Sequence, residues 1–309
     1  MHISIQRLLI YMIPWLLIAS CKEDDLASTE EWLIPINEVR DGGPGKDGIP
    51  ALENPEMVEA GAISYLDSSD LIIGFQLGKD VRAYPHKILD WHEIINDVVS
   101  GTPIAITYCP LTGTGIGWDR NINGQITSFG VSGLLYNTNL IPYDRATDSN
   151  WSQIGLQSVN GPMIGTDVNT FQVFETTWYT WKKMFPDTRV VSLNTGHSRN
   201  YQRYPYGNYR TEQGLIFSVS VNDERLPQKE RVHGIIVDTN VKAYQFKNFG
   251  SFRIIEDEFQ GEQLIIIGSE DKNFIVSFYS TMLNGEPIQF EMADSIMDGV
   301  ILKDQFGNR

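Results

Sequence analysis

One thiol in the sequence could do chemistry: Cys109, in the stretch ITYCPLTGTGIGWDR over residues 106–120. The alternation of residues 104–109 is typical of a strand and puts Tyr108 and Cys109 on opposite faces. Pro110 then favours an extended backbone at Cys109 and removes the next hydrogen-bond donor of the ladder. We therefore expect the thiol at the end of a strand, beside a turn rich in threonine and glycine.

A thiol in that place suits two chemistries. The Cys109 thiolate could bind a Zn or Cu ion together with His92 and a neighbouring carboxylate. It could instead act as a nucleophile beside His92 and Glu93, with the N–H groups around Thr112 and Gly113 stabilising an oxyanion. The structural alternative is a small buried side chain, because free cysteine is often fully buried. The sequence leaves all three open, and whether the protein is an enzyme stays undecided.

Residues 85–99, PHKILDWHEIINDVV, show helical spacing of apolar residues and predict a helix that begins after Pro85. His92 lies on the apolar face of that helix, so it could also be a core histidine. The opposite, polar stripe of the predicted helix consists of His86, Asp90, Glu93 and Asp97. Adjacent helical side chains diverge by about 100°, so His92 and Glu93 would not grip one ion together.

Two further segments carry candidate ligand-binding residues. Residues 129–153 hold Ser132 in a predicted turn, followed by Asp144 and Trp151. The loop HSRNYQRYPYGNYR, which contains Arg203 and Tyr204, could stack on a flat small molecule or a glycan and hold an anionic group. The alternative is that the tyrosines pack the loop onto a sheet.

The N-terminus predicts export. Residues 1–20 hold an apolar run behind Arg7, typical of a signal peptide, and Ile18-Ala19-Ser20-Cys21 is similar to a bacterial lipobox. We expect Cys21 to carry the acyl chains that anchor an outer-membrane lipoprotein of the cell envelope, with residues 21–36 as an acidic tether. The residues after Cys21, Lys22-Glu23-Asp24-Asp25, resemble an export tag of surface lipoproteins and favour the outer surface. If Cys21 carries lipid, Cys109 has no partner for an intramolecular disulfide.

Charge and patterning limit the partners and the fold. Asp and Glu number 39 against 24 Lys and Arg, a net charge of −15, which argues against nucleic acid. Many short β-rich runs, one of them near 215–221, accompany a second predicted helix over residues 173–185. We predict a β-rich α+β fold with a sandwich or barrel-like sheet core and two or more helices, forming one domain over residues 37–309.

Six blocks, from RDGGPGKDGIPAL to RLPQKERVHGI, together resemble the bacterial family called domain of unknown function 3179. The other four blocks are AYPHKILDWHEIIND, TYCPLTGTGIGWDR, FGVSGLLYNTNLIPYDRATDSNWSQ and TGHSRNYQRYPYGNY. The resemblance runs from about residue 36 to the C-terminus and implies no particular reaction. Some members of that family carry a second cysteine where this chain has Thr112, so the resemblance implies that no dithiol cycle operates here.

Overall fold

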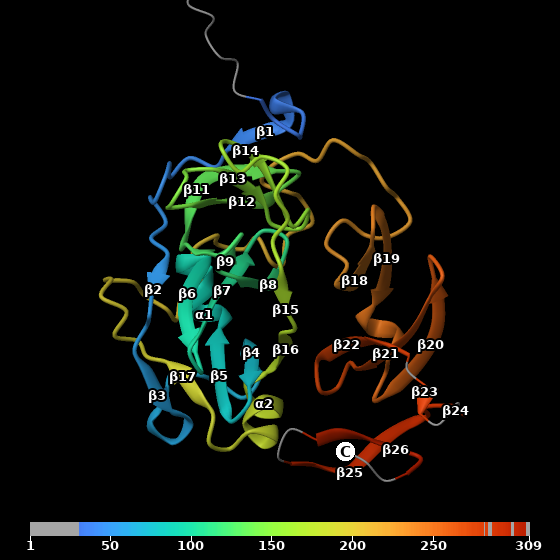
Figure 1. The fold of residues 1–309 in the computed structure, drawn as a ribbon. Helices are drawn as coiled ribbons and strands as arrows, with labels where there is room; N and C mark the ends of the chain where they lie inside the picture. The colour runs from blue at the N-terminus through green and yellow to red at the C-terminus, as the bar shows by residue number, and fades with distance from the viewer. Residues whose placement is uncertain (1–30, 281, 284–285, 298–299, 307–309) are drawn as a thin grey trace, which may run out of the picture. The chain divides into compact units, whose positions relative to one another are not determined.

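The computed structural model describes residues 31–280, 282–283, 286–297 and 300–306 (Figure 1). The predicted signal peptide, Cys21 and most of the predicted tether lie outside these residues. From Trp32 onward the described chain is one compact unit. Within that part, no helix has both the length and the apolar character needed to cross a membrane.

A five-stranded sheet, called here the central sheet, carries Cys109. Its strands run in the order β15 (Thr170–Phe171), β8 (Thr114–Asp119), β7 (Thr102–Cys109), β6 (Ile94–Val99) and β2 (Leu52–Glu53). Strands β6 and β7 pair antiparallel through a two-residue turn in which Ser100 and Gly101 both have positive φ. That conformation matches the twist of the flanking strands and fixes their register.

Two more five-stranded sheets pack with the central sheet. The β4–β5 sheet has the order β16 (Phe174–Thr177), β4 (Leu71–Leu77), β5 (Asp80–Pro85), β17 (Arg189–Val191) and β3 (Met57–Glu59). The β11–β12 sheet has the order β1 (Val39–Asp41), β11 (Phe129–Tyr136), β12 (Asn139–Asp144), β13 (Asn150–Ser152) and β14 (Gln157–Asn160).

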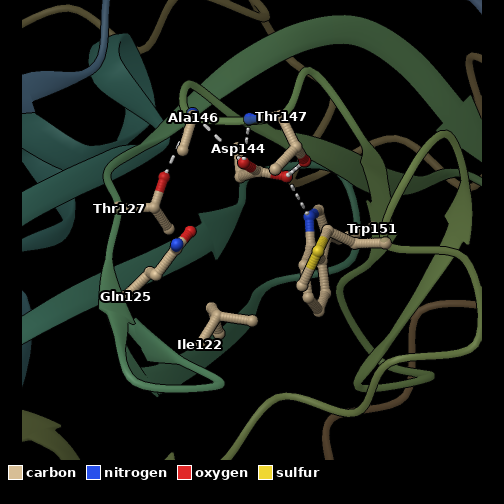
Figure 2. A pocket seen from close by; sticks show the side chains of 8 residues that line it. Ile122, Gln125, Thr127, Asp144, Ala146, Thr147 and Trp151 are labelled. Carbon is tan, nitrogen blue, oxygen red and sulfur yellow. Dashed lines mark hydrogen bonds between the residues drawn. The ribbon is translucent and has the colours of Figure 1, made fainter.

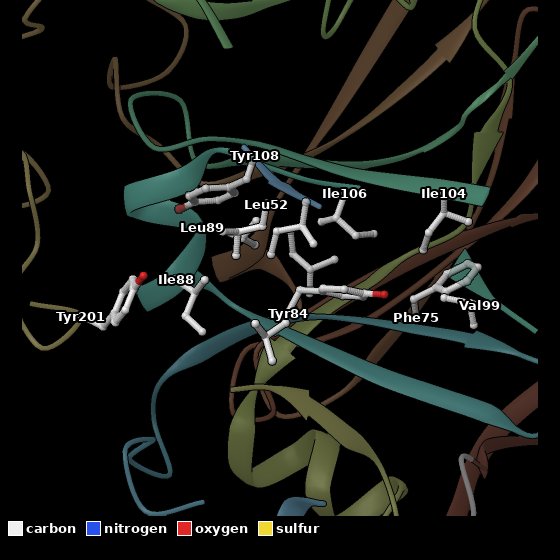
Figure 3. Close-up of a cluster of buried hydrophobic side chains, with 13 residues drawn as sticks. Leu52, Phe75, Tyr84, Ile88, Leu89, Val99, Ile104, Ile106, Tyr108 and Tyr201 are labelled. Carbon is white, nitrogen blue, oxygen red and sulfur yellow. The ribbon is translucent and has the colours of Figure 1, made fainter. Parts of the chain in front are cut away.

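Strand β7 contributes to two separate apolar clusters. Ile104, Ile106 and Tyr108 join side chains of the β4–β5 sheet, such as Tyr84 (Figure 3). Cys109, by contrast, joins Trp151 and other side chains of the β11–β12 sheet. The alternation predicted for residues 104–109 is therefore confirmed, and neither face of β7 is left to solvent.

The remaining strands form smaller sheets. They are β9 (Asn121–Ile122) with β10 (Gln125–Ile126), β18 (Val232–Val237) with β19 (Asn240–Gln245), β20 (Arg253–Phe259) with β21 (Glu262–Ser269) and β22 (Phe274–Tyr279), β23 (Met282–Leu283) with β24 (Glu286–Pro287), and β25 (Phe290–Met297) with β26 (Val300–Asp304). Short 3-10 turns span Ile36–Glu38, Ala60–Ala62 and Phe246–Asn248. No sheet formed by the described residues closes into a barrel, whereas the strand-rich fold with two α-helices is confirmed.

Both helices are shorter than the sequence pattern predicted. Helix α1 spans His86–His92, and residues 94–99 form β6 instead of continuing the helix. The helix ends because Glu93 adopts φ 57° and ψ −34°, which no helical residue can have. Helix α2 spans Trp178–Met184, since residues 174–177 pair with β4 as β16.

Two smaller expectations are also wrong. Ser132 and Gly133 lie inside β11, where the register against β12 shifts in a bulge, and not in a turn between strands. Gly133 has φ 83° there, a conformation that glycine adopts without cost. Residues 215–221 form no strand.

Candidate functional site

Cys109 ends β7 as predicted, and its thiol is buried with only 1% of the residue exposed. The Sγ atom lies 3.5 Å from the carbonyl oxygen of Thr138. Burial, and then the charge of Glu93, raises the pKa of the Cys109 thiol. The N–H groups of Leu111 and Thr112 act in the opposite direction by favouring the thiolate. The turn thus offers donors to the sulfur in an otherwise apolar place.

Glu93 lies at the neighbouring strand end. Its carbonyl oxygen accepts a 2.7 Å hydrogen bond from the Tyr108 N–H, so Glu93 is adjacent to the last residues of β7. The side chain is buried, and the Tyr206 hydroxyl donates to its Oε1 at 2.8 Å. Burial raises the pKa of Glu93 to about 7, and the charge of Asp90 adds to the rise. A carboxyl with this pKa can both accept and donate a proton near neutral pH.

Asp90 is a second buried acid, one helical turn before Glu93. Its Oδ1 accepts a 2.7 Å hydrogen bond from Nη2 of Arg210. Burial nevertheless raises the pKa of Asp90 to about 7, because it outweighs the attraction of the Arg210 charge. Two protonatable carboxyls therefore lie three positions apart around the end of α1.

His92 is fixed by partners other than Cys109. Its Nδ1 lies 2.7 Å from the carbonyl oxygen of Pro50, and its Nε2 lies 2.7 Å from the Tyr201 hydroxyl. A carbonyl only accepts, so Nδ1 carries the proton and Nε2 accepts from Tyr201. Burial lowers the pKa of His92 to about 4, so the ring is neutral. The structure therefore brings Glu93, but not the nitrogens of His92, into the electrostatic surroundings of the thiol.

The loop that contains Tyr204 covers this site; we call residues 201–210 the tyrosine segment. The Tyr204 hydroxyl donates to the carbonyl oxygen of Pro110 at 3.2 Å, and that of Tyr209 donates to the carbonyl of Leu111 at 3.1 Å. With Tyr206 on Glu93, three tyrosines close over the turn and the strand ends. The tyrosines therefore pack onto the rest of the protein, as the structural alternative for this loop expected, and in doing so they cover the thiol.

Arg203 takes a different position from Tyr204. Its backbone carbonyl accepts from Trp91 Nε1 at 3.0 Å, whereas its side chain is exposed. Arg210 is the arginine that enters the site, with its guanidinium 4.1 Å from the ring centre of Tyr204.

Thr112 and Gly113 form the turn itself. The Thr112 hydroxyl donates to Thr114 Oγ1 at 2.9 Å and accepts from Asn139 Nδ2 at 3.1 Å. Gly113 has φ 65°, and its N–H donates to the carbonyl oxygen of Cys109 at 2.8 Å. That N–H is already used, so the donors left for an anion at the sulfur are those of Leu111 and Thr112.

Asp144 and Trp151 come together in a separate small pocket of about 20 Å³ (Figure 2). The Asp144 oxygens accept from the N–H groups of Ala146 and Thr147, at 3.1 and 2.7 Å, and from Trp151 Nε1 at 3.1 Å. Ser132 is not a lining residue; its hydroxyl donates to Ile141 and accepts from the Leu134 N–H within the bulge. Asp144 therefore holds the loop that follows β12.

A metal ion at Cys109 and His92 stays a prediction. Over the described ranges, no three His, Cys, Asp or Glu side chains gather in a way that could hold an ion.

Asp90, Tyr206 and Arg210 were not named from the sequence as site residues, although Asp90 lay in the polar stripe and the other two in the tyrosine loop. Asp90 and Arg210 are separated by 120 positions, so no local pattern reveals their contact.

Comparison with known proteins places the chain in a family. The family described as protein of unknown function, DUF3179, matches residues 46–306. The chain belongs to the DUF3179 family. Every residue of the site, from Asp90 to Arg210, lies inside the matched range of DUF3179, whereas Cys21 precedes it. No curated protein and no solved structure matches the chain.

Proposed function

We propose that this DUF3179 protein is an exported, lipid-anchored enzyme that uses Cys109 as a nucleophile and Glu93 as its general base. The observation that carries the proposal is the placement of Glu93. Its carboxyl is buried and its charge raises the pKa of the Cys109 thiol, and its backbone has φ 57°. Each of these features costs free energy, of the order of 1–3 kcal/mol for the backbone conformation, and such costs gather where a side chain has a task.

The chemistry that fits these residues is acyl transfer. The Glu93 carboxylate accepts the proton from Cys109 Sγ, and the thiolate adds to the carbonyl carbon of an acyl substrate. Glu93 then returns the proton to the leaving group as the bond to it breaks, which leaves a thioester on Cys109. Water hydrolyses that thioester and regenerates the thiol. The N–H groups of Leu111 and Thr112 support the negative charge at the sulfur.

Substrate access requires movement of the tyrosine segment, because Cys109 is only 1% exposed. The hydrogen bond from Tyr206 to Glu93 links that segment to the proposed base. Opening would release Glu93 from one partner and uncover the sulfur in the same step.

The experiment uses p-nitrophenyl acetate as an acyl donor and measures the mass of the intact protein. We expect one acetyl group on Cys109 in the wild type, none in Cys109→Ala, and at least tenfold slower acetylation in Glu93→Gln. Glu53→Gln is the matched control, since Glu53 binds Asn96 and Arg145 outside the site. Acetylation of Cys109 at equal rates in the wild type and Glu93→Gln would refute the role of the base.

A second candidate is a binding protein for a small ligand or glycan in which Cys109 is structural, and the burial of Cys109, which is 1% exposed, supports it. The pocket beside Trp151 is about 20 Å³, room for about one water molecule, so by itself it holds neither a small ligand nor a glycan. Saturable quenching of tryptophan fluorescence by a small ligand or a glycan that persists in Cys109→Ala would favour this candidate. A lack of any acetylation at Cys109 would do the same.

The anchor is part of the proposal. Acyl chains on Cys21 would hold the protein in the cell envelope, at the outer membrane. Labelling of growing cells with radioactive palmitate should mark the wild type and not Cys21→Ala. Equal labelling of both would exclude Cys21 as the modified residue. The acidic composition supports a partner other than nucleic acid.

A further inference from the structure

His86, the first residue of α1, is a buried histidine for which the proposed chemistry has no task. It is 5% exposed, and its Nε2 atom has no hydrogen-bond partner. Across the described part of the chain, the only other buried side-chain atom in this state is Trp118 Nε1. A buried polar atom without a partner costs about 1–3 kcal/mol, and a ligand that accepts from His86 Nε2 would remove that cost.

The groups around His86 include a tyrosine, two arginines and the carboxyl of Glu175. Its ring packs 4.4 Å from the ring of Tyr108, and the Tyr108 hydroxyl lies 3.5 Å from Nη2 of Arg210. Arg231 is bound at 2.6 Å to Glu175, whose Oε1 is 4.0 Å from His86 Nε2. Burial, with the charges of both arginines, holds the pKa of His86 well below its usual value, so the ring is neutral.

Arg210 gives this cluster an opening to solvent. Its side chain is 48% exposed, whereas the Asp90 side chain that it binds is 4% exposed. Its Nη2 contacts Asp90 and the Tyr108 hydroxyl, and the guanidinium packs on the ring of Tyr204, so a ligand that reaches Tyr108 must take the place of Asp90 at Nη2. A guanidinium, a phenol and an imidazole N–H together form a donor set suited to a carboxylate.

We propose that Arg210, Tyr108 and His86 bind the carboxylate of a small organic ligand, with the ligand replacing Asp90 on Arg210. In this complex His86 donates from Nε2, which removes its unpaired state. The site extends toward Asp90 and Glu93, so a bound carboxylate would lie beside the thiol site. The binding itself goes beyond the proposed acyl transfer and does not require Cys109.

The test uses sodium acetate as the probe and thermal unfolding as the measurement, with sodium chloride at equal ionic strength as the reference. We expect acetate to raise the Tm of the wild type and of Cys109→Ala, but not that of His86→Leu or Arg210→Gln. Without acetate, His86→Leu should melt about 3 °C higher than the wild type, because the unpaired nitrogen is gone. Arg210→Gln changes a half-exposed side chain and serves if His86→Leu does not fold.

His233→Leu is the matched control. His233 is also partly buried, but its Nε2 lies 2.9 Å from the Ser277 hydroxyl, so it has a partner to lose. That variant should melt lower than the wild type and keep its acetate response. A wild type that does not respond to acetate, or a response that survives in both His86→Leu and Arg210→Gln, overturns the proposal. Retention of the response in Cys109→Ala separates this result from the fate of the acyl-transfer proposal.

Discussion

Replacing Glu93 with glutamine should stabilise the protein above neutral pH and leave it almost unchanged in acid. Glutamine keeps the size of the side chain and can still accept the Tyr206 hydrogen bond, which is 2.8 Å long in the wild type. It also keeps the backbone conformation of Glu93. The difference between the two proteins therefore reports the charge of one buried carboxylate.

The magnitude follows from the pKa. Burial raises the pKa of Glu93 from 4.5 to about 7, and each pKa unit corresponds to about 1.4 kcal/mol. The folded wild type binds the proton more tightly than the unfolded chain, so its stability falls as the pH rises from about 4.5 to about 7. Above that window the charged carboxylate costs about 3 kcal/mol, and Glu93→Gln does not bear this cost.

Urea unfolding at pH 5 and pH 8 measures the effect. We expect the free energy of unfolding of Glu93→Gln to exceed that of the wild type by about 3 kcal/mol at pH 8 and by much less at pH 5. The pKa of Asp90 is also raised by burial, but Asp90 is present in both proteins. Its contribution to the pH dependence of stability therefore cancels to first order when the two are compared. A difference of the same size at both pH values would refute the assignment of a raised pKa to Glu93.

Three further changes test the packing around the site. Asp144→Ala removes the acceptor of two backbone N–H groups and of Trp151 Nε1. In urea unfolding, the free energy of unfolding should fall by about 2–3 kcal/mol. A fall of less than about 0.5 kcal/mol would contradict the role given to Asp144. Gly74→Ala places a methyl group 2.4 Å from the ring of Trp181, so thermal melts should show a loss of stability of about 2 kcal/mol. Gly61→Ala is the control, because its methyl group meets no atom within 4 Å. Equal melting temperatures for the two variants would show that Trp181 moves aside freely. Tyr206→Phe removes the hydroxyl that lowers the pKa of Glu93, so the NMR titration of Glu93 should move to higher pH, and an unchanged midpoint would show that the hydroxyl does not act on it.

The surroundings of Cys109 could be predicted in part because the relevant signals are local. Alternation over residues 104–109 and the proline at position 110 are enough to place the thiol at a strand end, and β7 ends there. The turn that follows is also local, since Gly113 supplies a conformation that other residues avoid. A strand and its turn can be read from a few adjacent residues.

The end of α1 could not be predicted in the same way. Residues 94–99 satisfy the helical spacing, but in β6 they distribute between the two faces of the central sheet. Asp97 is buried there against Arg82 and Tyr84, at 2.6 and 2.7 Å, which a polar stripe on a helix would not suggest. The β-branched residues of this run were the available signal for a strand.

The partners of the site were beyond reach because they are distant in the sequence. Tyr206 and Glu93 are 113 positions apart, and only the folded chain brings the tyrosine segment over the turn. His92 was expected beside the thiol because the two residues are close in sequence. Its ring is instead held by Pro50 and Tyr201, in contacts that span 42 and 109 positions.

The position of β7 between two apolar clusters has a consequence for how the chain can change. A slip of one residue against β6 would exchange the destinations of Tyr108 and Cys109, and each side chain would then meet a space shaped for the other. An insertion within this strand would damage both clusters together, while substitutions that respect the alternation would act on one alone. Around Cys109 the strand therefore tolerates single substitutions that act on one cluster better than insertions or deletions, which disturb both.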